Sequence, residues 1–363
     1  MSANDLLTWA DPYYPDGRLP GSVREAITRH LDGGLAAHYT DALGLPSLRE
    51  AIAARFPASA TVAPHANQVI VTAGSTTGLY FAMSVLFGRG DEIIVTDPGF
   101  PDYLSDCAGL GLTPVPLTLR AGDGWQIDED ALEALVTERT RGLVLANPLN
   151  PTTTVLTRGS AEAIGRVAAR HGLLVVNDEA FADHILVDRP YVSLRSVPGL
   201  ADRTLTVRSF SKGYGLSGLR VGALIGTEPV MGRLRPLAED RLGATASLCQ
   251  LAAEAALNDD SLLGPITEDF RARAALVGRI LGGVPGVRVS PIESGFLSWL
   301  DVSALGGGDA VTRRLAERGI AVQPGSHYGK AGAGYIRVSQ GAYRDRARLE
   351  QVFERMAGAL RAM

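Results

Sequence analysis

Short apolar runs alternate with helical patterns between residues 68 and 226. The runs are rich in Val, Ile and Leu with little polar alternation, which is typical of strands covered on both faces by helices. Segments between them, such as 76–87 and 160–170, have the apolar spacing of helices that pack on a sheet. The seven predicted strands are 68–71, 92–96, 113–119, 142–146, 173–177, 204–209 and 222–226. The pattern predicts an α/β fold with a seven-stranded, mostly parallel sheet sandwiched by helices.

The pattern of apolar and polar residues changes after residue 226. Long Arg/Leu/Ala-rich stretches predict helices, and short strands and a closing helix then predict a smaller α+β unit. The predicted helices are 230–257, 262–281 and 344–360, and the predicted strands are 287–290, 295–302, 320–323 and 335–339. Residues 1–45 show no strong strand. We expect an N-terminal arm at 1–45 that packs on the small domain or a partner subunit, a large ligand-binding domain at 46–235 and a small C-terminal domain at 236–363.

Composition narrows the class of partner. The chain has 363 residues, a net charge of -4 and no run of Lys or Arg, which argues against nucleic acid or an anionic membrane surface and favours small molecules. Its two cysteines, Cys107 and Cys249, lie far apart, so neither a disulfide framework nor a CxxC site is expected and a reducing cytoplasm fits. The amino terminus lacks the pattern of a signal peptide, and no apolar stretch of about 18 residues predicts a membrane span.

Two further patterns bear on chemistry. The six histidines show no HxH or HExxH spacing and no GxGxxG follows a strand, so we assign neither a metal nor a nicotinamide cofactor. Of the 35 basic residues only Lys212 and Lys330 are lysines. A lysine can lose its proton and attack a carbonyl, whereas an arginine cannot. A lysine in such a chain is therefore worth inspecting for chemistry, and the chance retention of two lysines is the alternative.

Lys212 lies in a turn dense in glycine and hydroxyl groups between two predicted strands, within Val-Arg-Ser-Phe-Ser-Lys-Gly-Tyr-Gly-Leu-Ser-Gly-Leu-Arg-Val-Gly at 207–222. Ser209 and Ser211 precede the lysine, and Arg220 follows it by eight residues. Two hydroxyls and a guanidinium can converge on one anion there, and a phosphate suits that set of donors. In isolation, a glycine-rich turn with solvated side chains remains the alternative.

This segment resembles the lysine motif of class I/II pyridoxal-phosphate-dependent aminotransferases, which have fold type I. The similarity extends over nearly the whole chain, because the other landmarks of the family appear in order. The resemblance implies that Lys212 holds pyridoxal 5'-phosphate as an imine and moves the proton of the substrate α-carbon. It also implies transfer of an amino group between an L-amino acid and a 2-oxo acid.

The resemblance assigns the cofactor site residue by residue. In Thr-Ala-Gly-Ser-Thr-Thr-Gly at 72–78, the residues that match the phosphate-binding turn are Gly74, Ser75 and Thr76, together with Ser209, Ser211 and Arg220. Asp-Pro-Gly-Phe-Pro-Asp-Tyr at 97–103 matches the loop whose aromatic residue, here Phe100, stacks on the cofactor ring. Tyr103 is a further candidate for the wall of that pocket.

Four more matches complete the set. Asn150, in the asparagine loop at 147–153, corresponds to the residue that hydrogen-bonds the phenolic oxygen of the cofactor and borders the substrate. Asp178, at the end of a predicted strand, corresponds to the partner of the pyridine nitrogen. Arg337 corresponds to the clamp on the substrate α-carboxylate. Tyr39 matches a tyrosine that reaches the cofactor phosphate of the neighbouring subunit, which implies a homodimer.

Two positions depart from the family pattern. Thr153 stands where the family usually has glycine, which puts the backbone angles of the asparagine loop in doubt. Phe181 stands where tyrosine is common and supplies no donor to the phenolic oxygen, so we expect the imine to titrate at a higher pH. These departures leave an alternative open: elimination, cyclisation or β/γ-replacement, as in aminocyclopropane-carboxylate synthases or amino-acid cyclases. A ligand-sensing domain of a transcription regulator is a third, non-enzymatic interpretation.

Overall fold

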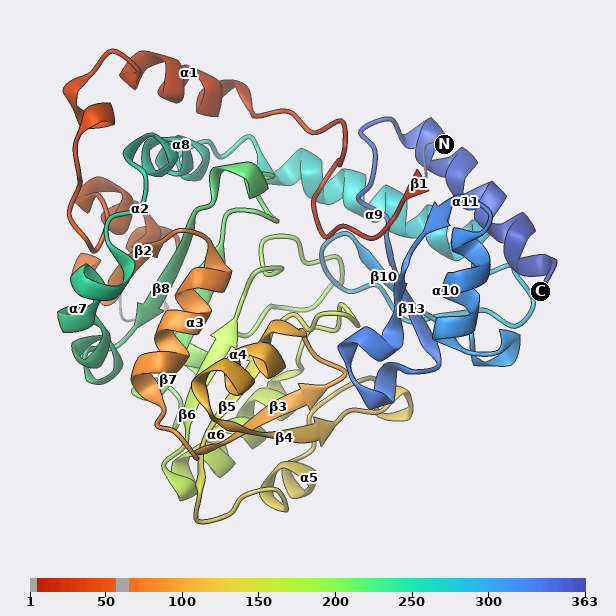
Figure 1. Cartoon of the computed structure of the whole chain (residues 1–363), viewed down its shortest axis with the longest axis horizontal. Helices are drawn as coiled ribbons and strands as arrows, with labels where there is room; N and C mark the ends of the chain where they lie inside the picture. The colour runs from red at the N-terminus through yellow and green to blue at the C-terminus, as the bar shows by residue number, and fades with distance from the viewer. Residues whose placement is uncertain (1–4, 57–64) are drawn as a thin grey trace.

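The computed structural model describes residues 5–56 and 65–363, and a seven-stranded sheet forms its centre (Figure 1). The strand order is β2-β8-β7-β6-β5-β3-β4. Neighbouring strands are parallel except where β8 pairs antiparallel with β2 and with β7. The strands are β2 (Val69–Thr72), β3 (Glu92–Asp97), β4 (Thr113–Thr118), β5 (Thr140–Ala146), β6 (Leu174–Asp178), β7 (Thr204–Ser209) and β8 (Gly222–Gly226). The seven-stranded, mostly parallel sheet predicted from the sequence is confirmed.

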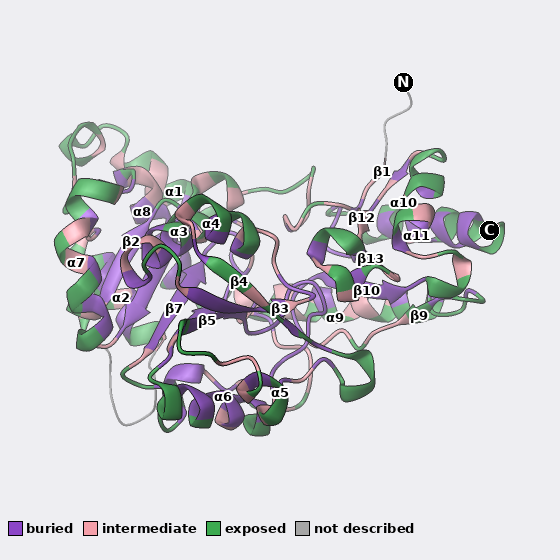
Figure 2. Cartoon of the chain, turned by 60° about the horizontal axis from the view of Figure 1, so that its bottom comes forward, coloured by how far each residue is buried: buried purple, intermediate pink, exposed green. Residues whose placement is uncertain are grey.

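Helices cover both faces of this sheet (Figure 2). Within β5, Leu143 and Leu145 pack on one face with α5 and α6, while Val144 between them packs on the other with α3, α4 and α7. Towards β2 and β8, the first face is completed by α1, α2 and α8. The helices are α1 (Gly21–His30), α2 (Pro46–Arg55), α3 (Ser75–Leu86), α4 (Asp102–Leu110), α5 (Glu129–Glu133), α6 (Arg158–His171), α7 (Glu228–Leu242) and α8 (Ser247–Leu257). Burial on both sides explains why the strands lack polar alternation.

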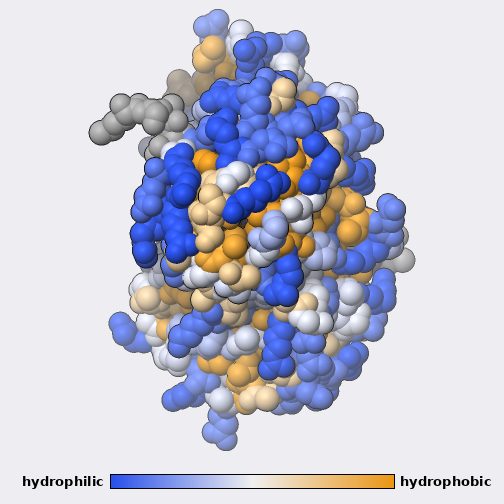
Figure 3. Space-filling view, turned by 90° about the vertical axis from the view of Figure 1, so that its right-hand side faces the viewer, coloured by the Kyte–Doolittle hydropathy of each residue, from blue (hydrophilic) through white to orange (hydrophobic). Residues whose placement is uncertain are grey.

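A second, antiparallel sheet of order β12-β13-β10-β9 lies beside the first. Its core is shared with the C-terminal helices. Seen from that side, apolar atoms gather in the middle of the molecular face, with hydrophilic atoms around them (Figure 3). The elements are α9 (Leu263–Ile280), β9 (Arg288–Val289), β10 (Leu297–Asp301), α10 (Gly308–Ala316), β11 (Ile320–Ala321), β12 (Gln323–Pro324), β13 (Tyr335–Ser339) and α11 (Arg346–Arg361).

The structure differs from the sequence-based expectations in how segments are divided. The stretch 230–257 forms two helices, because Gly243 adopts a positive φ of 62° between α7 and α8. The expected boundary between residues 235 and 236 falls inside α7. Helix α8 packs on α1 and α2 beside the large sheet, whereas α9 runs from that region to the small-sheet core (Figure 1). Residues 320–323, expected as one strand, contribute to β11 and β12, which belong to different sheets.

The N-terminal segment bridges the two sheets. Strand β1 (Asp5–Leu6) pairs in parallel with β11, and Leu7 is fully buried in the core of the small sheet. Four residues later, Asp11 Oδ1 accepts a hydrogen bond of 2.5 Å from Ser217 Oγ in the loop that follows β7. The residues between these two anchors therefore cross the space between the domains, directly over the carboxyl ends of the large-sheet strands.

Candidate active site

A cavity of about 230 Å³ lies at the carboxyl ends of the parallel strands. This edge is where ligands bind in open α/β sheets, because the loops that follow the strands meet there. The structure brings most of the sequence-predicted residues together on its wall. The predicted residues that line the cavity are Ser75, Thr76, Phe100, Asn150, Asp178, Phe181, Ser209, Ser211, Lys212, Arg220 and Arg337.

One end of the cavity is built to hold an anion. Gly74, with φ of 89°, is the N-cap of α3, so the backbone N–H groups of the first turn are free to bind a ligand. A Cβ at Gly74 would lie 2.4 Å from Arg220 Nη2, so only glycine lets the guanidinium approach this turn. Arg220 Nη1 donates to Ser211 Oγ (3.5 Å) and to the carbonyl of Ser217 (2.9 Å). A phosphate fits this combination of helix terminus, hydroxyls and arginine.

Lys212 lies between this end and the opposite wall. Its Nζ donates a hydrogen bond to the carbonyl of Ala10 in the crossing N-terminal segment. Burial lowers the pKa of Lys212 to about 8; Asp11 and Asp178 oppose that shift, and Arg337 and Arg220 add to it. The amine therefore exchanges its proton close to neutral pH, as a group that alternates between nucleophile and base requires.

Asp178, the last residue of β6, points into the same cavity. Its Oδ1 accepts the backbone N–H of Ala180 (3.0 Å), and its Oδ2 accepts the hydroxyl of Tyr103 (3.3 Å). Burial raises the pKa of Asp178 to about 6, although these two hydrogen bonds and Lys212 oppose the shift. A buried carboxylate of this kind favours a cationic partner such as a protonated pyridine nitrogen.

The opposite wall holds a second candidate anion site. Arg337, on β13, is buried; its Nη1 donates to Asn150 Oδ1 (3.3 Å) and its Nη2 to the carbonyl of Thr8 (2.7 Å). Its Nε is buried without a hydrogen-bond partner in the described part of the chain. Burial lowers the pKa of the guanidinium below its usual value, because a buried charge costs free energy. An anionic ligand would offset that cost. A carboxylate suits this geometry.

The asparagine loop keeps a glycine-type backbone conformation at Thr153, although threonine replaces the usual glycine there. Thr153 adopts the left-handed region with φ of 65°, where a β-branched residue is strained. Its Oγ1 donates to the carbonyl of Pro291 (3.3 Å) and accepts the N–H of Glu293 (3.2 Å), and its own carbonyl accepts Ser294 Oγ (2.9 Å). The threonine thus keeps a glycine-type conformation and ties the loop that carries Asn150 to the small domain.

The second departure, Phe181, forms an apolar part of the wall. Its ring packs against Phe296 at a centroid distance of 5.7 Å. Gly295 has to be a glycine here, because its φ is 62° and a Cβ would lie 2.7 Å from Phe181 Cδ1. The expected effect of Phe181 on the protonation of the cofactor linkage stays a prediction.

A buried polar network lies directly behind these residues. Arg208, next to Ser209 on β7, donates to Glu179 (3.4 Å), which follows Asp178, and to the carboxylate of Asp183. The chain after Lys212 is held from the same side, since His184 Nε2 contacts the carbonyl of Gly213 at 2.9 Å. The network fixes the strand ends that carry Asp178 and Lys212 relative to each other.

Tyr39 lies away from the cavity of its own chain. The side chain is 96% exposed, and it borders a shallow depression shared with Thr245 and neighbouring residues of the α7–α8 connection. Tyr39 is not among the described residues that line the cavity beside Arg220. Its predicted contact with the neighbouring subunit stays a prediction.

Several wall residues were not found from the sequence. Trp9, Asp102, Gln323 and Tyr328 all line the cavity. Asp102 and Tyr103 follow Phe100 within the loop at 97–103, and that adjacency was the one available signal. The others come from distant segments whose positions depend on the tertiary fold.

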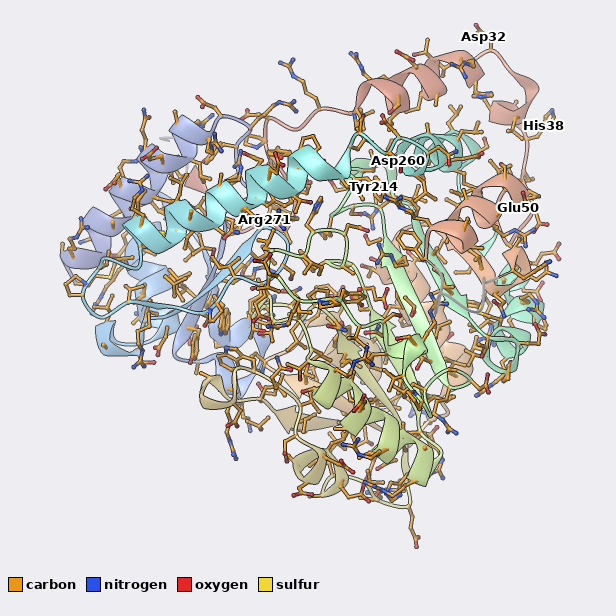
Figure 4. The ribbon with its side chains drawn as sticks, turned by 180° about the vertical axis from the view of Figure 1, so that it is seen from behind. Asp32, His38, Glu50, Tyr214, Asp260 and Arg271 are labelled. Carbon is orange, nitrogen blue, oxygen red and sulfur yellow. The ribbon has the colours of Figure 1, made fainter. Side chains whose placement is uncertain are left out.

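A larger cavity of about 820 Å³ adjoins the first and shares Lys212 with it. Tyr214 lines this larger cavity beside the α8–α9 connection, which contains Asp260 (Figure 4). Arg271 lies further along, on α9. Arg18, Arg24 and Arg344 contribute positive charge to its wall. The two cavities together give an open approach to Lys212.

The described residues include neither a membrane-spanning helix nor a metal-binding cluster. Among the helices of residues 5–56 and 65–363, none combines the length and apolar character needed to cross a bilayer. The same residues contain no group of three or more His, Cys, Asp or Glu side chains placed to hold a metal ion.

Comparison with known proteins identifies the family. The profile of "Aminotransferase class I and II" matches residues 6–356. An arginine–pyruvate transaminase of Pseudomonas aeruginosa is 33% identical over 92% of this chain and 84% of its own length, and an aspartate aminotransferase of Musicola paradisiaca is 32% identical over 90% and 82%. The solved aromatic aminotransferase of Pyrococcus horikoshii superposes with a TM-score of 0.91 at 28% identity, covering 99% of this chain and 96% of that one.

The chain belongs to the class I and II aminotransferase family. It has fold type I, uses pyridoxal 5'-phosphate and transfers amino groups between amino acids and 2-oxo acids. These relatives are named as aminotransferases, so elimination, cyclisation or replacement is not favoured, in spite of Thr153 and Phe181.

Proposed function

We propose that Lys212 is the residue that binds the cofactor and moves the proton, and that the surrounding residues hold cofactor and substrate around it. The observation that supports this most directly is the position of one half-buried lysine between two unlike anion sites, one at Arg220 and one at Arg337. Asp178 completes the arrangement from the floor of the cavity. A phosphorylated cofactor and a substrate carboxylate each then have a separate cationic partner.

Each residue has a physical task in this proposal. Bound pyridoxal phosphate supplies an aldehyde for the amino group and a ring that accepts electrons. Gly74, Ser75, Thr76, Ser209, Ser211 and Arg220 bind its phosphate, Phe100 and Phe181 flank its ring, Asn150 orients its phenolic oxygen, and Asp178 holds its ring nitrogen protonated. Arg337 orients the substrate α-carboxylate. Lys212 Nζ takes the proton from the substrate α-carbon and then donates it again to complete the transfer of the amino group.

The half-reaction tests this proposal without knowledge of the acceptor. Holoenzyme given an amino donor alone is expected to release about one 2-oxo acid per site and then stop, because the amino group remains on the cofactor. Addition of a 2-oxo acid should restart the reaction. A panel that includes arginine, aspartate and aromatic donors covers the names of the relatives. Continuous release of ammonia from a donor alone, without stoichiometric arrest, would instead support an elimination enzyme.

We further propose a cytoplasmic homodimer in which Tyr39 reaches the phosphate site of its partner. The support is that Tyr39 is almost fully exposed in a single chain while Arg220 also faces solvent. A hydroxyl from a second copy would add a donor to a phosphate that this chain surrounds incompletely. Two free cysteines, Cys107 and Cys249, agree with a reducing compartment.

Mixed dimers test the sharing of sites. Tyr39→Ala and Lys212→Ala homodimers should both be impaired, yet mixing and reassociating their subunits should restore about a quarter of the wild-type activity, because half of the dimers then have one intact site. Tyr80→Ala, which changes another exposed tyrosine, is the control and should act like the wild type. If Tyr39 served its own chain, the mixture would show no recovery.

A further inference from the structure

Asp102 is a carboxylate on the cavity wall that neither the cofactor nor the substrate α-carboxylate accounts for. It is the first residue of α4, half-buried, two positions after Phe100. The other carboxylate that lines this cavity, Asp178, accepts hydrogen bonds from Tyr103 and Ala180. The Asp102 carboxylate has no hydrogen bond or ion pair within residues 5–56 and 65–363, and only its backbone carbonyl is engaged, by Ser105 Oγ at 3.0 Å.

The surroundings of Asp102 disfavour a charge without a partner. Burial raises the pKa of Asp102 above its usual range, while His327 and Lys212 act in the opposite direction without being close enough for an ion pair. Position at a helix N-terminus explains an acidic residue in the first turn of α4, but a helix terminus does not require the side chain to face a cavity. A half-buried carboxylate on the cavity wall, with no protein partner among the described residues, can pair with a cationic group of a ligand.

An indole lies on the same wall, on a different element. Trp9 belongs to the segment that crosses between the domains, and it lines the cavity although 57% of its side chain is exposed. Exposed tryptophan of this kind provides a flat apolar surface for an aliphatic stem, and its ring attracts a cation. An acidic substrate side chain would gain nothing from the ring and would be repelled by Asp102.

We propose that the amino donor of this enzyme is an L-amino acid with a cationic side chain, whose positive group pairs with Asp102 and whose stem packs on Trp9. This inference rests on the proposed function, because it takes the α-carboxylate to be held by Arg337 and the amino group to lie at Lys212. It leaves Arg220 for the phosphate, so each charged group of donor and cofactor has one partner of opposite sign. Guanidinium and ammonium side chains share this chemistry.

Pairs of amino donors that have a similar shape but differ in side-chain charge test whether a cationic group is recognised. Arginine and citrulline have nearly the same shape but only arginine is cationic, and lysine and norleucine differ in the same way. Wild-type holoenzyme is expected to use the cationic member of at least one pair with a kcat/KM about 10- to 100-fold higher, and the pair that shows it identifies guanidinium or ammonium. Asp102→Asn should remove this preference while leaving kcat/KM for the neutral donor within about twofold.

A binding measurement separates recognition from turnover. 5-Guanidinopentanoate, which is arginine without its α-amino group, should bind wild-type holoenzyme about 10-fold or more tightly than hexanoate in calorimetric titrations, and Asp102→Asn should equalise the two. Asp123→Asn, which changes an exposed acidic residue, is the control and should keep the preference. Thermal melts of Asp102→Asn should give a melting temperature at or above that of the wild type, because the substitution removes a half-buried charge, and a lower value would mean that α4 is disturbed.

The two levels of the proposal fail in different ways. If donors react but citrulline and norleucine are used as well as arginine and lysine, or if Asp102→Asn leaves an existing preference unchanged, the assignment of Asp102 is overturned and the aminotransferase site stands. If no donor of any charge yields a 2-oxo acid and the protein takes up no cofactor, the proposed roles of Lys212 and Arg337 are overturned first.

Discussion

Replacement of Lys212 by alanine is expected to lower the rate of amino transfer by at least about 10²- to 10⁴-fold, the range that a positioned acid–base group contributes. The variant should also bind pyridoxal phosphate reversibly, because no other amine lines the cavity in the described part of the chain. In the cofactor-free protein, burial lowers the pKa of Lys212 to about 8, so capture of the cofactor by the wild-type protein should slow on the acidic side as the free amine becomes protonated.

The sequence contains only two lysines, so the residue that binds the cofactor can be identified directly. Lys330, on the exposed surface, is the other lysine of the sequence and provides the matched control. Borohydride reduction of the holoenzyme followed by peptide mapping should place the pyridoxyl group on Lys212, and Lys330→Ala should retain wild-type activity. Label on Lys330, or full activity in Lys212→Ala, would remove Lys212 from the mechanism.

The architecture could be predicted because periodicity reports burial directly. A strand such as β5, covered on both faces, can contain Leu143, Val144 and Leu145 in succession, and that run is visible in the sequence. The short strands of the small domain were harder to divide. Residues 320–323 read as one apolar run, yet Ile320 pairs with β1 and Gln323 with β13, a split set by partners far along the chain.

The candidate site divides in the same way. Lys212 could be singled out because glycine and hydroxyl residues mark its turn in the sequence, whereas the role expected of Gly74 came from the resemblance to the family. Trp9 and Asp102 could not, since the first depends on a segment anchored by Leu7 in another core and the second on the orientation of α4. Thr153 was recognised as a departure, but its contacts with Pro291 and Glu293 appear only in three dimensions.

Opposite effects on cofactor affinity and on stability are expected when Asp178 is replaced by asparagine. Loss of the carboxylate opposite the ring nitrogen should weaken cofactor binding by about 10- to 100-fold, the range of a charge-assisted hydrogen bond. Amino transfer should fall further, by about 10²- to 10³-fold, because the same charge stabilises electrons that move into the ring as the proton leaves. Equilibrium binding of cofactor and single-turnover rates measure the two losses separately.

Asp178→Asn is expected to stabilise the cofactor-free protein, although it weakens cofactor binding. In the cofactor-free protein, burial raises the pKa of Asp178 from 3.8 to about 6, so the charged carboxylate costs folding free energy at neutral pH. Asp178→Asn should therefore raise the free energy of unfolding of cofactor-free protein by up to about 3 kcal/mol at pH 8. This difference should shrink as the pH falls from about 6 to about 4 and disappear below about pH 3, where the wild-type carboxyl is protonated in both states. Urea unfolding at several pH values measures it.

Asp106 supplies the matched control for both effects. It is also a buried carboxyl whose pKa burial raises to about 6, and its Oδ2 has no hydrogen-bond partner in the described residues, but it does not line the cavity. Asp106→Asn should stabilise the cofactor-free protein in the same pH window and leave cofactor affinity unchanged. Because only Asp178 faces the ligand, a loss of affinity in both variants would mean that folding, not contact with the ring nitrogen, explains the effect of Asp178→Asn.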